Sequence, residues 1–299
     1  MRRDIEFPSK GLKCRGWLYV PDVSVAKQPA PAIVMAHGFS AVKEMFRLSA
    51  YAERFEEAGF VTLVFDFRFL GASDGEPRGH IISHEQQEDY RNAITWLSRQ
   101  PEVNADRIGV WGTSLSGGHV LHLAAFDKRI KAVVAQVPTI SPWRQIIHRS
   151  GRDGLNQLMH MLTADRLQRF DSETVNYIQV VGPKGELSAL SAPDAYEAMT
   201  RNAAIAPNWI NKVTMESLEN YTEYHPTASI ELISPTPLMM VLAEQDSLIP
   251  AELARAAFDR AGDPKELKTF PCRHFEVYET EPWFSKAVGS MVDWYTRYL

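Results

Sequence analysis

The sequence predicts an α/β protein whose central, mostly parallel β-sheet has helices on both faces and an inserted helical segment. Short apolar runs alternate with segments of helical period, and this alternation stops between Thr139 and Ile230 and then resumes. In addition, 45% of the 299 residues are hydrophobic, which is ample for a well-buried core. Strands that alternate with amphipathic helices pair in parallel, so the helices have to cover both faces of the sheet.

The predicted strands are short apolar runs bounded by turn residues. They lie at 13–19, 32–36, 61–65, 108–111, 130–135, 237–243 and 267–270. Most of these runs are apolar throughout, which is typical of strands that are buried on both faces. The turn sequence Ser9-Lys10-Gly11 predicts an antiparallel hairpin at one edge of the sheet.

Helices are predicted where apolar residues recur at i, i+3, i+4 and i+7. The residues with this spacing are Leu48, Tyr51, Ala52 and Phe55 in the first helix and Tyr90, Ala93, Ile94 and Leu97 in the second. The last helix repeats the spacing with Phe284, Ala287, Val288, Met291, Val292 and Tyr295. Ser83 and Gln86 have the spacing of a capping box, so we expect them to begin the second helix.

The segment without strands contains three helix-like stretches, at 143–148, 155–170 and 192–204, separated by glycine and proline residues. It follows one strand and precedes another, so it should leave and re-enter the sheet at the carboxyl ends of strands. Open α/β sheets bind their ligands at these ends. We therefore predict a core formed by residues 1–139 and 231–299 and a helical cap formed by residues 140–230.

Charge and composition exclude several classes of partner. The chain has 32 Lys and Arg against 37 Asp and Glu, a net charge of −5, so it offers no broad positive surface to nucleic acid or to anionic lipid. No secretory signal or membrane-spanning run is recognisable, and two cysteines far apart in the sequence suit a reducing compartment. We expect a cytoplasmic protein that acts on a small molecule, and a homo-oligomer is compatible with the sequence.

The strongest chemical signal is the apolar strand that ends at Trp111 and runs into serines among small residues. A serine on a strained strand-to-helix turn needs small residues two positions away on each side, and Ser114 has Gly112 and Ser116 there. Ser116 has small neighbours too, namely Ser114 and Gly118, and is the alternative nucleophile. Ser114 is favoured because it follows the end of the strand more closely.

A serine nucleophile needs a histidine as its base and a carboxylate that orients this histidine. Of the nine histidines, only His274 lies beyond the inserted segment, in a polar loop after a strand. Asp246 follows the preceding strand, in a loop that should face the loop of His274. Glu244 at the end of that strand is the alternative acid, whereas Asp259 falls in a helical stretch.

The remaining histidines predict no metal site. His119 and His122 have a spacing that would suit two ligands on one helix, but no third ligand is evident. We interpret them as a hydrogen-bonded pair near the helix surface. His37 is expected to support its loop by hydrogen bonding. The serine chemistry predicted above requires neither a metal nor an organic cofactor.

These residues resemble the α/β-hydrolase superfamily, in which the nucleophile elbow, the acid after a late strand and the C-terminal histidine follow in this order. The resemblance covers nearly the whole chain outside the predicted cap. It implies that Ser114 is the nucleophile, Asp246 the orienting acid and His274 the general base. The loop His37-Gly38-Phe39 is similar to the superfamily's loop after the third strand. It implies an oxyanion hole formed by the backbone N–H groups of Phe39 and Leu115.

Within the superfamily, residues 112–118 and 274–278 resemble dienelactone-hydrolase-like and Xaa-Pro-peptidase-like hydrolases and fungal polyketide transferases. The implied activity is hydrolysis of a carboxylic ester or thioester through an acyl-enzyme on Ser114. The alternatives are an acyltransferase or thioesterase of a biosynthetic, polyketide-type pathway, an aminopeptidase-like hydrolase, or a binding protein without catalysis.

The cap contributes candidate residues for an apolar acyl pocket. We expect Trp143, Met159 and Trp209 to contribute to it, and Met161, Met199 and Met215 are further candidates. The same residue types also serve to pack a helical cap on itself.

Overall fold

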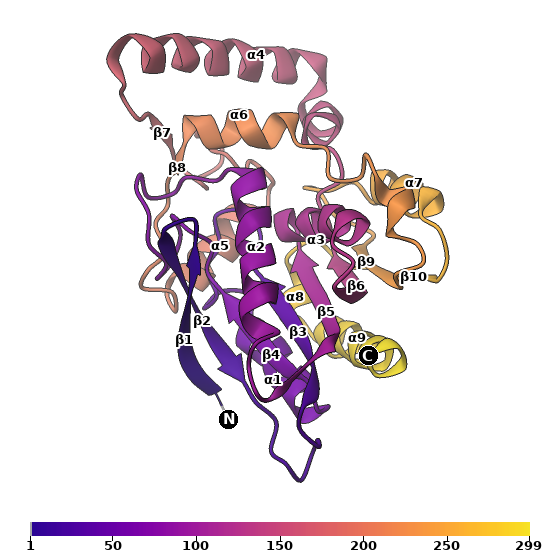
Figure 1. Ribbon diagram of the computed structural model, residues 1–299. Helices are drawn as coiled ribbons and strands as arrows, with labels where there is room; N and C mark the ends of the chain where they lie inside the picture. Colours follow the sequence, from indigo (N-terminus) through magenta and orange to yellow (C-terminus); the bar gives the residue numbers. More distant parts are fainter. Residues whose placement is uncertain (1) are drawn as a thin grey trace.

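Eight strands form the central sheet in the computed structural model, which describes residues 2–299 (Figure 1). In chain order they are β1 (Arg2–Ser9), β2 (Leu12–Tyr19), β3 (Ala30–Ala36), β4 (Val61–Phe65), β5 (Val103–Thr113), β6 (Ile130–Gln136), β9 (Leu238–Ala243) and β10 (Lys265–Phe270). Their order across the sheet is β1-β2-β4-β3-β5-β6-β9-β10. The β1–β2 and β2–β4 pairs are antiparallel and the other pairs are parallel. The predicted fold class and the edge hairpin are confirmed.

Helices cover both faces of the sheet. On one face α1 (Leu48–Glu57) packs against α9 (Trp283–Tyr298), which also contacts the short α8 (Glu276–Glu279). On the other face α2 (Ser83–Leu97) packs against α3 (Leu115–Phe126), and α7 (Ala251–Arg260) packs against β9. None of the helices between residues 2 and 299 is long and apolar enough to cross a membrane.

The indole of Trp111 shows how the central strand β5 is fixed between these layers. Successive residues of a strand point to opposite faces, and Trp111 points toward α1 and α9. Its Nε1 donates a hydrogen bond to the sulfur of Met291 at 3.2 Å, and its ring packs against Tyr51. Trp111 is fully buried, so the strand that leads to Ser114 is anchored immediately before its end.

Two local predictions are wrong. Ser83 does not cap α2, because the helix begins at Ser83 itself, Ile82 is at the N-cap position and none of the described side chains caps the helix. Instead, the Oε1 atom of Gln86 lies 2.9 Å from a ring nitrogen of His119. In addition, β5 begins at Val103 and not at residue 108, because its first part is largely exposed and therefore lacks an apolar pattern.

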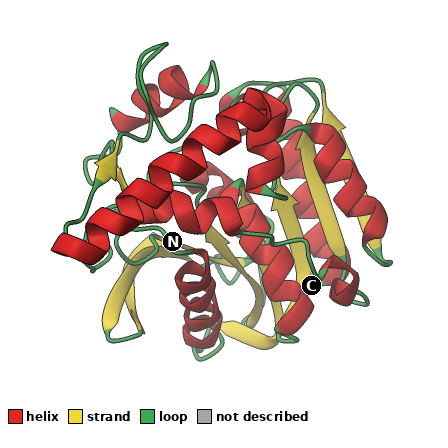
Figure 2. Ribbon diagram, turned by 90° about the horizontal axis from the view of Figure 1, so that it is seen from above, coloured by secondary structure: helices red, strands yellow, loops and turns green. Residues whose placement is uncertain are grey.

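Residues 140–230, here called the inserted segment, add no strand to the central sheet. They contain α4 (Pro142–Ser172), β7 (Tyr177–Ile178), α5 (Ala195–Ala203), β8 (Val213–Thr214) and α6 (Met215–Glu223), and η1 (Ile230–Ile233) leads back to β9. Seen from above, the long helix α4 crosses over the molecule (Figure 2). Two of the predicted helices are joined in α4, which kinks at Gly151, where φ is 68°.

The inserted segment is packed onto the rest of the protein by a shared apolar core. Leu162 and Met199 of this segment are buried in the same cluster as Phe39 and Phe275. Polar contacts add to this packing: Nε1 of Trp209 donates to the carbonyl of Ser40 at 2.8 Å. The division into a core and a cap domain stays a prediction, since the buried cluster is continuous between them.

Candidate active site

Loops that follow four parallel strands meet around one cavity. They come after β3, β5, β9 and β10, and they contribute Phe39, Ser114, Leu248 and His274 to its lining. Because β3 and β5 are neighbours, with Ala36 opposite Gly112, the loop after β3 passes directly beside Ser114. Parallel pairing therefore places residues that are far apart in the sequence at one edge of the sheet.

Ser114 lies at the sharp turn between β5 and α3, with φ 54° and ψ −117°. This backbone conformation is strained for a residue with a side chain and is typical of a nucleophile elbow. Neighbouring residues hold the turn, because the Ser114 N–H donates to the carbonyl of Gln136 at 2.9 Å and its carbonyl accepts from Thr139 at 2.8 Å. Ser114 is half-buried, whereas the residues on either side of it are buried.

Two glycines allow this turn to form. A Cβ at Gly112 would lie 2.1 Å from the carbonyl oxygen of Ser116, a backbone atom that cannot move without breaking the turn. A Cβ at Gly38 would lie 2.9 Å from Cβ of Ser114. The small residues that the sequence predicted around the serine are thus required by close backbone approaches, both within the turn and between the turn and the loop after β3.

The structure brings His274 and Asp246 together. Nδ1 of His274 lies 2.6 Å from Oδ2 of Asp246, and both side chains are buried. Since a carboxylate oxygen accepts, Nδ1 carries the proton and Nε2 is left with its lone pair. The other carboxylate oxygen of Asp246 accepts from the backbone N–H groups of Leu248 and Ile249, each at 2.8 Å. The carboxylate is therefore held in one orientation.

The alternative residues have other partners. Oγ of Ser116 is fully buried, accepts from the N–H of Thr113 at 2.8 Å and donates to the carbonyl of Ala36 at 2.7 Å. The carboxylate of Glu244 faces Arg255 at 3.1 Å. Ser116 thus supports the turn from beneath, and Glu244 is paired with Arg255. The geometry favours Ser114 and Asp246 over these two residues.

The backbone N–H groups of Phe39 and Leu115, which the sequence predicts to form an oxyanion hole, lie next to Ser114. Phe39 follows Gly38, which abuts Ser114, and Leu115 is the first residue of α3, where helical N–H groups have no partner within the helix. Among residues 2–299, neither N–H donates a hydrogen bond. His37 stabilises the loop after β3 because its Nδ1 donates to the carbonyl of Gly38 at 3.0 Å.

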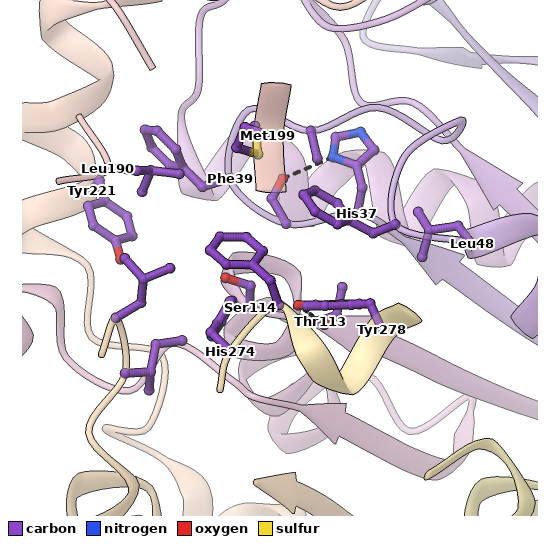
Figure 3. Close-up of a pocket in the computed structure, with 16 residues that line it drawn as sticks. His37, Phe39, Leu48, Thr113, Ser114, Leu190, Met199, Tyr221, His274 and Tyr278 are labelled. Atoms are coloured by element: carbon purple, nitrogen blue, oxygen red, sulfur yellow. Dashed lines mark hydrogen bonds between the residues drawn. The ribbon is translucent and has the colours of Figure 1, made fainter. Parts of the chain in front are cut away.

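The cavity at Ser114 is small and mostly apolar, with a volume of about 40 Å³. In Figure 3, Ser114, His274, Thr113 and Tyr278 lie on one side of it, and Phe39, Leu190, Met199 and Tyr221 lie on the other. Leu190, Met199 and Tyr221 belong to the inserted segment, so this segment closes the cavity from above. About 40 Å³ accommodates a few water molecules, so a substrate has to displace some of these side chains.

The predicted pocket residues of the inserted segment are mostly placed elsewhere. Of the six aromatic and methionine candidates, only Met199 lines the cavity at Ser114. Trp143 and Met159 are 37% and 43% exposed on α4 and are not brought to the site. Trp209 contacts the loop after β3 through its hydrogen bond to Ser40 but does not line the cavity. Residue type alone could not show which face of a helix points toward the serine.

Sequence reasoning missed a buried polar network beneath Ser114. The hydroxyl groups of Thr113 and Tyr278 are 2.6 Å apart, and the hydroxyl of Thr113 also donates to the carbonyl of Gln136 at 3.3 Å. Tyr51 donates to the side chain of Gln136 at 3.2 Å. These groups come from β5, β6, α1 and α8, and no local pattern links them. They fix the strand end that carries Ser114.

His119 differs from its prediction. It is fully buried between α2, α3 and the inserted segment, not near a helix surface. One ring nitrogen lies 2.9 Å from the hydroxyl of Tyr224 and the other 2.9 Å from Oε1 of Gln86. Both ring nitrogens therefore have protein partners, and His119 does not form a hydrogen bond with His122. Burial lowers the pKa of His119 to about 3, so its ring is neutral.

The fold and this arrangement define a serine hydrolase of the α/β-hydrolase class. A solved structure of an α/β hydrolase, GrgF from Penicillium sp. sh18, superimposes with a TM-score of 0.84 at 30% identity and covers 100% of this chain and 99% of that chain. Residues 11–275 match the X-Pro dipeptidyl-peptidase family (S15 family), and the chain belongs to this family.

Named relatives are similar over most of their length. The quorum-quenching protein AidA of Acinetobacter baumannii is 31% identical over 98% of this chain and 94% of its own. The polyketide transferase grgF of Penicillium sp. is 34% identical over 89% of this chain and 86% of its own. The thiohydrolase aneE of Aspergillus aculeatus is 31% identical over 91% of this chain and 85% of its own. The predicted resemblance is confirmed.

Proposed function

We propose that the protein cleaves a carboxylic ester or thioester through an acyl-enzyme on Ser114. One observation carries this proposal. A strained serine and a histidine hydrogen-bonded to a buried aspartate share one apolar cavity, beside two backbone N–H groups that have no hydrogen-bond partner within residues 2–299. Nucleophile, base, orienting acid and oxyanion donors are thus present together, which is the arrangement that acyl transfer to a serine requires.

The reaction follows from these positions. Oγ of Ser114 attacks the carbonyl carbon while Nε2 of His274 takes its proton, and the N–H groups of Phe39 and Leu115 bind the developing oxyanion. The intermediate collapses, the bond to the alcohol or thiol breaks, and the leaving group takes the proton from His274. Water then attacks the acyl-enzyme with His274 as base, which releases the acid and regenerates Ser114. Oγ of Ser114 forms no hydrogen bond with His274 here, and such bonds often tighten only when substrate binds.

The names of the relatives support an ester or thioester as the substrate, since they include a thiohydrolase and a polyketide transferase. Cleavage of peptides with a free amino terminus is less well supported. Recognition of that amine needs a carboxylate near the serine, and none of the described residues that line the cavity carries one. Glu216 and Glu219, acids of the inserted segment, instead form ion pairs with Arg169. Transfer of the acyl group to an alcohol in place of water uses the same residues.

The assignment is tested by covalent labelling and kinetics. We expect a fluorophosphonate probe to modify the protein once, at Ser114, and Ser114→Ala to abolish the modification. We expect His274→Ala to lower turnover of p-nitrophenyl esters by at least about 10³-fold. Initial rates on esters of increasing acyl length, on thioesters and on aminoacyl substrates would then identify the substrate class.

Ser116→Ala is the control for labelling. This variant loses the buried hydrogen bonds of the Ser116 hydroxyl, so its melting temperature is measured alongside, but it should still be labelled at Ser114. Labelling that persists in Ser114→Ala and disappears in a folded Ser116→Ala variant would assign the nucleophile to Ser116. Near-normal ester turnover by His274→Ala would remove His274 from the mechanism.

A further inference from the structure

A second cavity, of about 220 Å³, lies within the inserted segment between α4, α6 and the stretch 178–191. Its walls are mostly apolar, with residues such as Ile146, Leu158, Met161 and Leu218. Its polar side chains are serine, threonine, glutamine, tyrosine and one arginine. Arg149 is the only charged residue among the described residues that line it.

In the described part of the chain, Arg149 has no partner for its charge. Its Nε is buried without a hydrogen bond, and within residues 2–299 its guanidinium forms no ion pair. Two acids on the adjacent helix α6 pair with other arginines: Glu219 with Arg166 at 2.6 Å and with Arg169 at 2.8 Å, and Glu216 with Arg169 at 3.6 Å. Burial lowers the pKa of Arg149, yet a guanidinium stays protonated in proteins.

The cavity at Arg149 borders the cavity at Ser114. Tyr221 lines both, and its ring packs against Phe39 with the ring centroids 5.2 Å apart. The stretch 188–191 is a second shared wall, because Leu190 lines the cavity at Ser114 and its neighbours Ala189 and Ser191 line the other. The shared wall at Tyr221 gives a molecule bonded to Ser114 a route toward Arg149 when the Tyr221 side chain rotates.

We propose that Arg149 binds a negatively charged group of the substrate, a carboxylate or a phosphate, that lies at a distance from the carbonyl attacked by Ser114. This inference rests on the proposed function. The anion would supply the missing partner of a partly buried guanidinium, which presents a planar fork of donors that matches carboxylate and phosphate oxygens. The apolar walls would hold the chain that links this group to the carbonyl.

Two parts of an ester or thioester could carry such a group. It lies either at the far end of the acyl chain, as a terminal carboxylate, or on the leaving group, as the phosphate of a phosphorylated pantetheine thiol. The chemistry at Arg149 is the same in both cases. Matched substrates distinguish them, since one pair varies only the acyl end and another varies only the leaving thiol.

The experiment measures kcat/KM for two substrate pairs. The first pair is the p-nitrophenyl ester of a straight-chain acid and the corresponding half-ester of the dicarboxylic acid of equal length. The second pair is the pantetheine and phosphopantetheine thioesters of one neutral acid. In at least one pair we expect the charged substrate to be favoured by about tenfold or more, the range of a hydrogen-bonded charge pair. Arg149→Met should abolish this preference, and Arg149→Lys should keep part of it.

Arg152→Met is the matched control, because Arg152 lies on the same helix and is exposed. It should retain the preference, whereas Arg149→Met should lose it through a lower kcat/KM for the charged substrates. The inference is overturned if neither charged substrate is favoured, or if the preference survives in Arg149→Met. Failure of the proposed function gives a different result, namely no Ser114-dependent turnover of any of the four substrates.

Discussion

The carboxylate of Asp246 is the most constrained group of the candidate site. One of its oxygens accepts hydrogen bonds from two backbone N–H groups, and the other accepts one from Nδ1 of His274. The backbone donors fix the carboxylate on its own loop, so it can orient the imidazole without moving. The hydrogen bond to Nδ1 also selects the tautomer that leaves Nε2 free to accept a proton from Ser114.

Asp246→Asn separates this orienting role from a structural one. The amide oxygen can still accept from Leu248 and Ile249, so we expect a melting temperature within a few degrees of the unchanged protein. The amide NH₂ would then face Nδ1, which favours the wrong tautomer of His274. We therefore expect kcat for a p-nitrophenyl ester to fall by about 10³- to 10⁴-fold.

Glu244→Gln is the comparison for this variant. Because Glu244 pairs with Arg255 at the surface, its loss should change kcat by less than about twofold. A large loss in Glu244→Gln together with near-normal kcat in Asp246→Asn would assign the orienting role to Glu244.

Single residues were predictable where the chemistry leaves a local pattern. The small residues around Ser114 are visible in the sequence, and so are the positions of Asp246 and His274 after late strands. These residues lie at the ends of strands, and the strands themselves are recognisable as apolar runs. Arg149 and Tyr221 gave no such signal, since their roles depend on which helix faces meet in space. Trp143 and Met159 were expected in the pocket for their residue type, but α4 leaves both exposed.

The turn from β5 to α3 places Ser114 between the end of a strand and the start of a helix. The strand ends at Thr113, Ser114 takes a conformation with positive φ, and α3 begins at once. Gly112 makes this possible, because the carbonyl of Ser116 occupies the place where a Cβ would be. The strain at Ser114 therefore depends on a neighbour that has no side chain.

Gly112→Ala should disrupt this turn. The added methyl group would lie 2.1 Å from a backbone oxygen, so the turn has to shift. We expect the rate of fluorophosphonate labelling to fall by at least about 10²-fold and the free energy of unfolding to fall by at least about 2 kcal/mol. Urea denaturation and labelling time courses measure the two effects.

Gly289→Ala is the opposite case. Gly289 is exposed in α9 with nothing near the position of its Cβ, so alanine should raise the free energy of unfolding by about 0.5–1 kcal/mol and leave labelling unchanged. Equal labelling rates in both variants would show that the close approach at Gly112 does not control the elbow.

Helices and strands of the core were predictable because burial against the sheet, or within it, sets the spacing of their apolar residues. The inserted segment was harder to predict. The kink at Gly151 joins two predicted helices into α4, and the helix α6, which supplies Tyr221, was not recognised. Short elements that pack on one another, and not on a sheet, have less regular apolar spacing. Their arrangement above Ser114 depends on tertiary contacts.

Histidines with lowered pKa values make the stability of the whole molecule depend on pH. Burial lowers the pKa values of five histidines, which belong to both the core and the inserted segment: His37, His80, His119, His122 and His225. The unfolded chain binds protons at these groups below about pH 6.5, whereas the folded protein resists protonation. The contribution of these histidines to stability should therefore be constant above that pH and decrease as the pH falls below it.

His119 provides the clearest test, since it is fully buried and its pKa is lowered to about 3. A histidine that stays neutral in the folded state reduces the free energy of unfolding by about 1.4 kcal/mol per pH unit below its ordinary pKa, or up to about 2 kcal/mol between pH 6.5 and pH 5. His119→Gln removes the titrating group, so its stability should decrease less steeply over this range. Urea denaturation from pH 7.5 to pH 5 measures how steeply the free energy of unfolding changes with pH in each protein.

His160→Gln is the control, because His160 is exposed on α4. This variant should show the same change in the free energy of unfolding with pH as the unchanged protein. The same change in His119→Gln would show that His119 is protonated in the folded state.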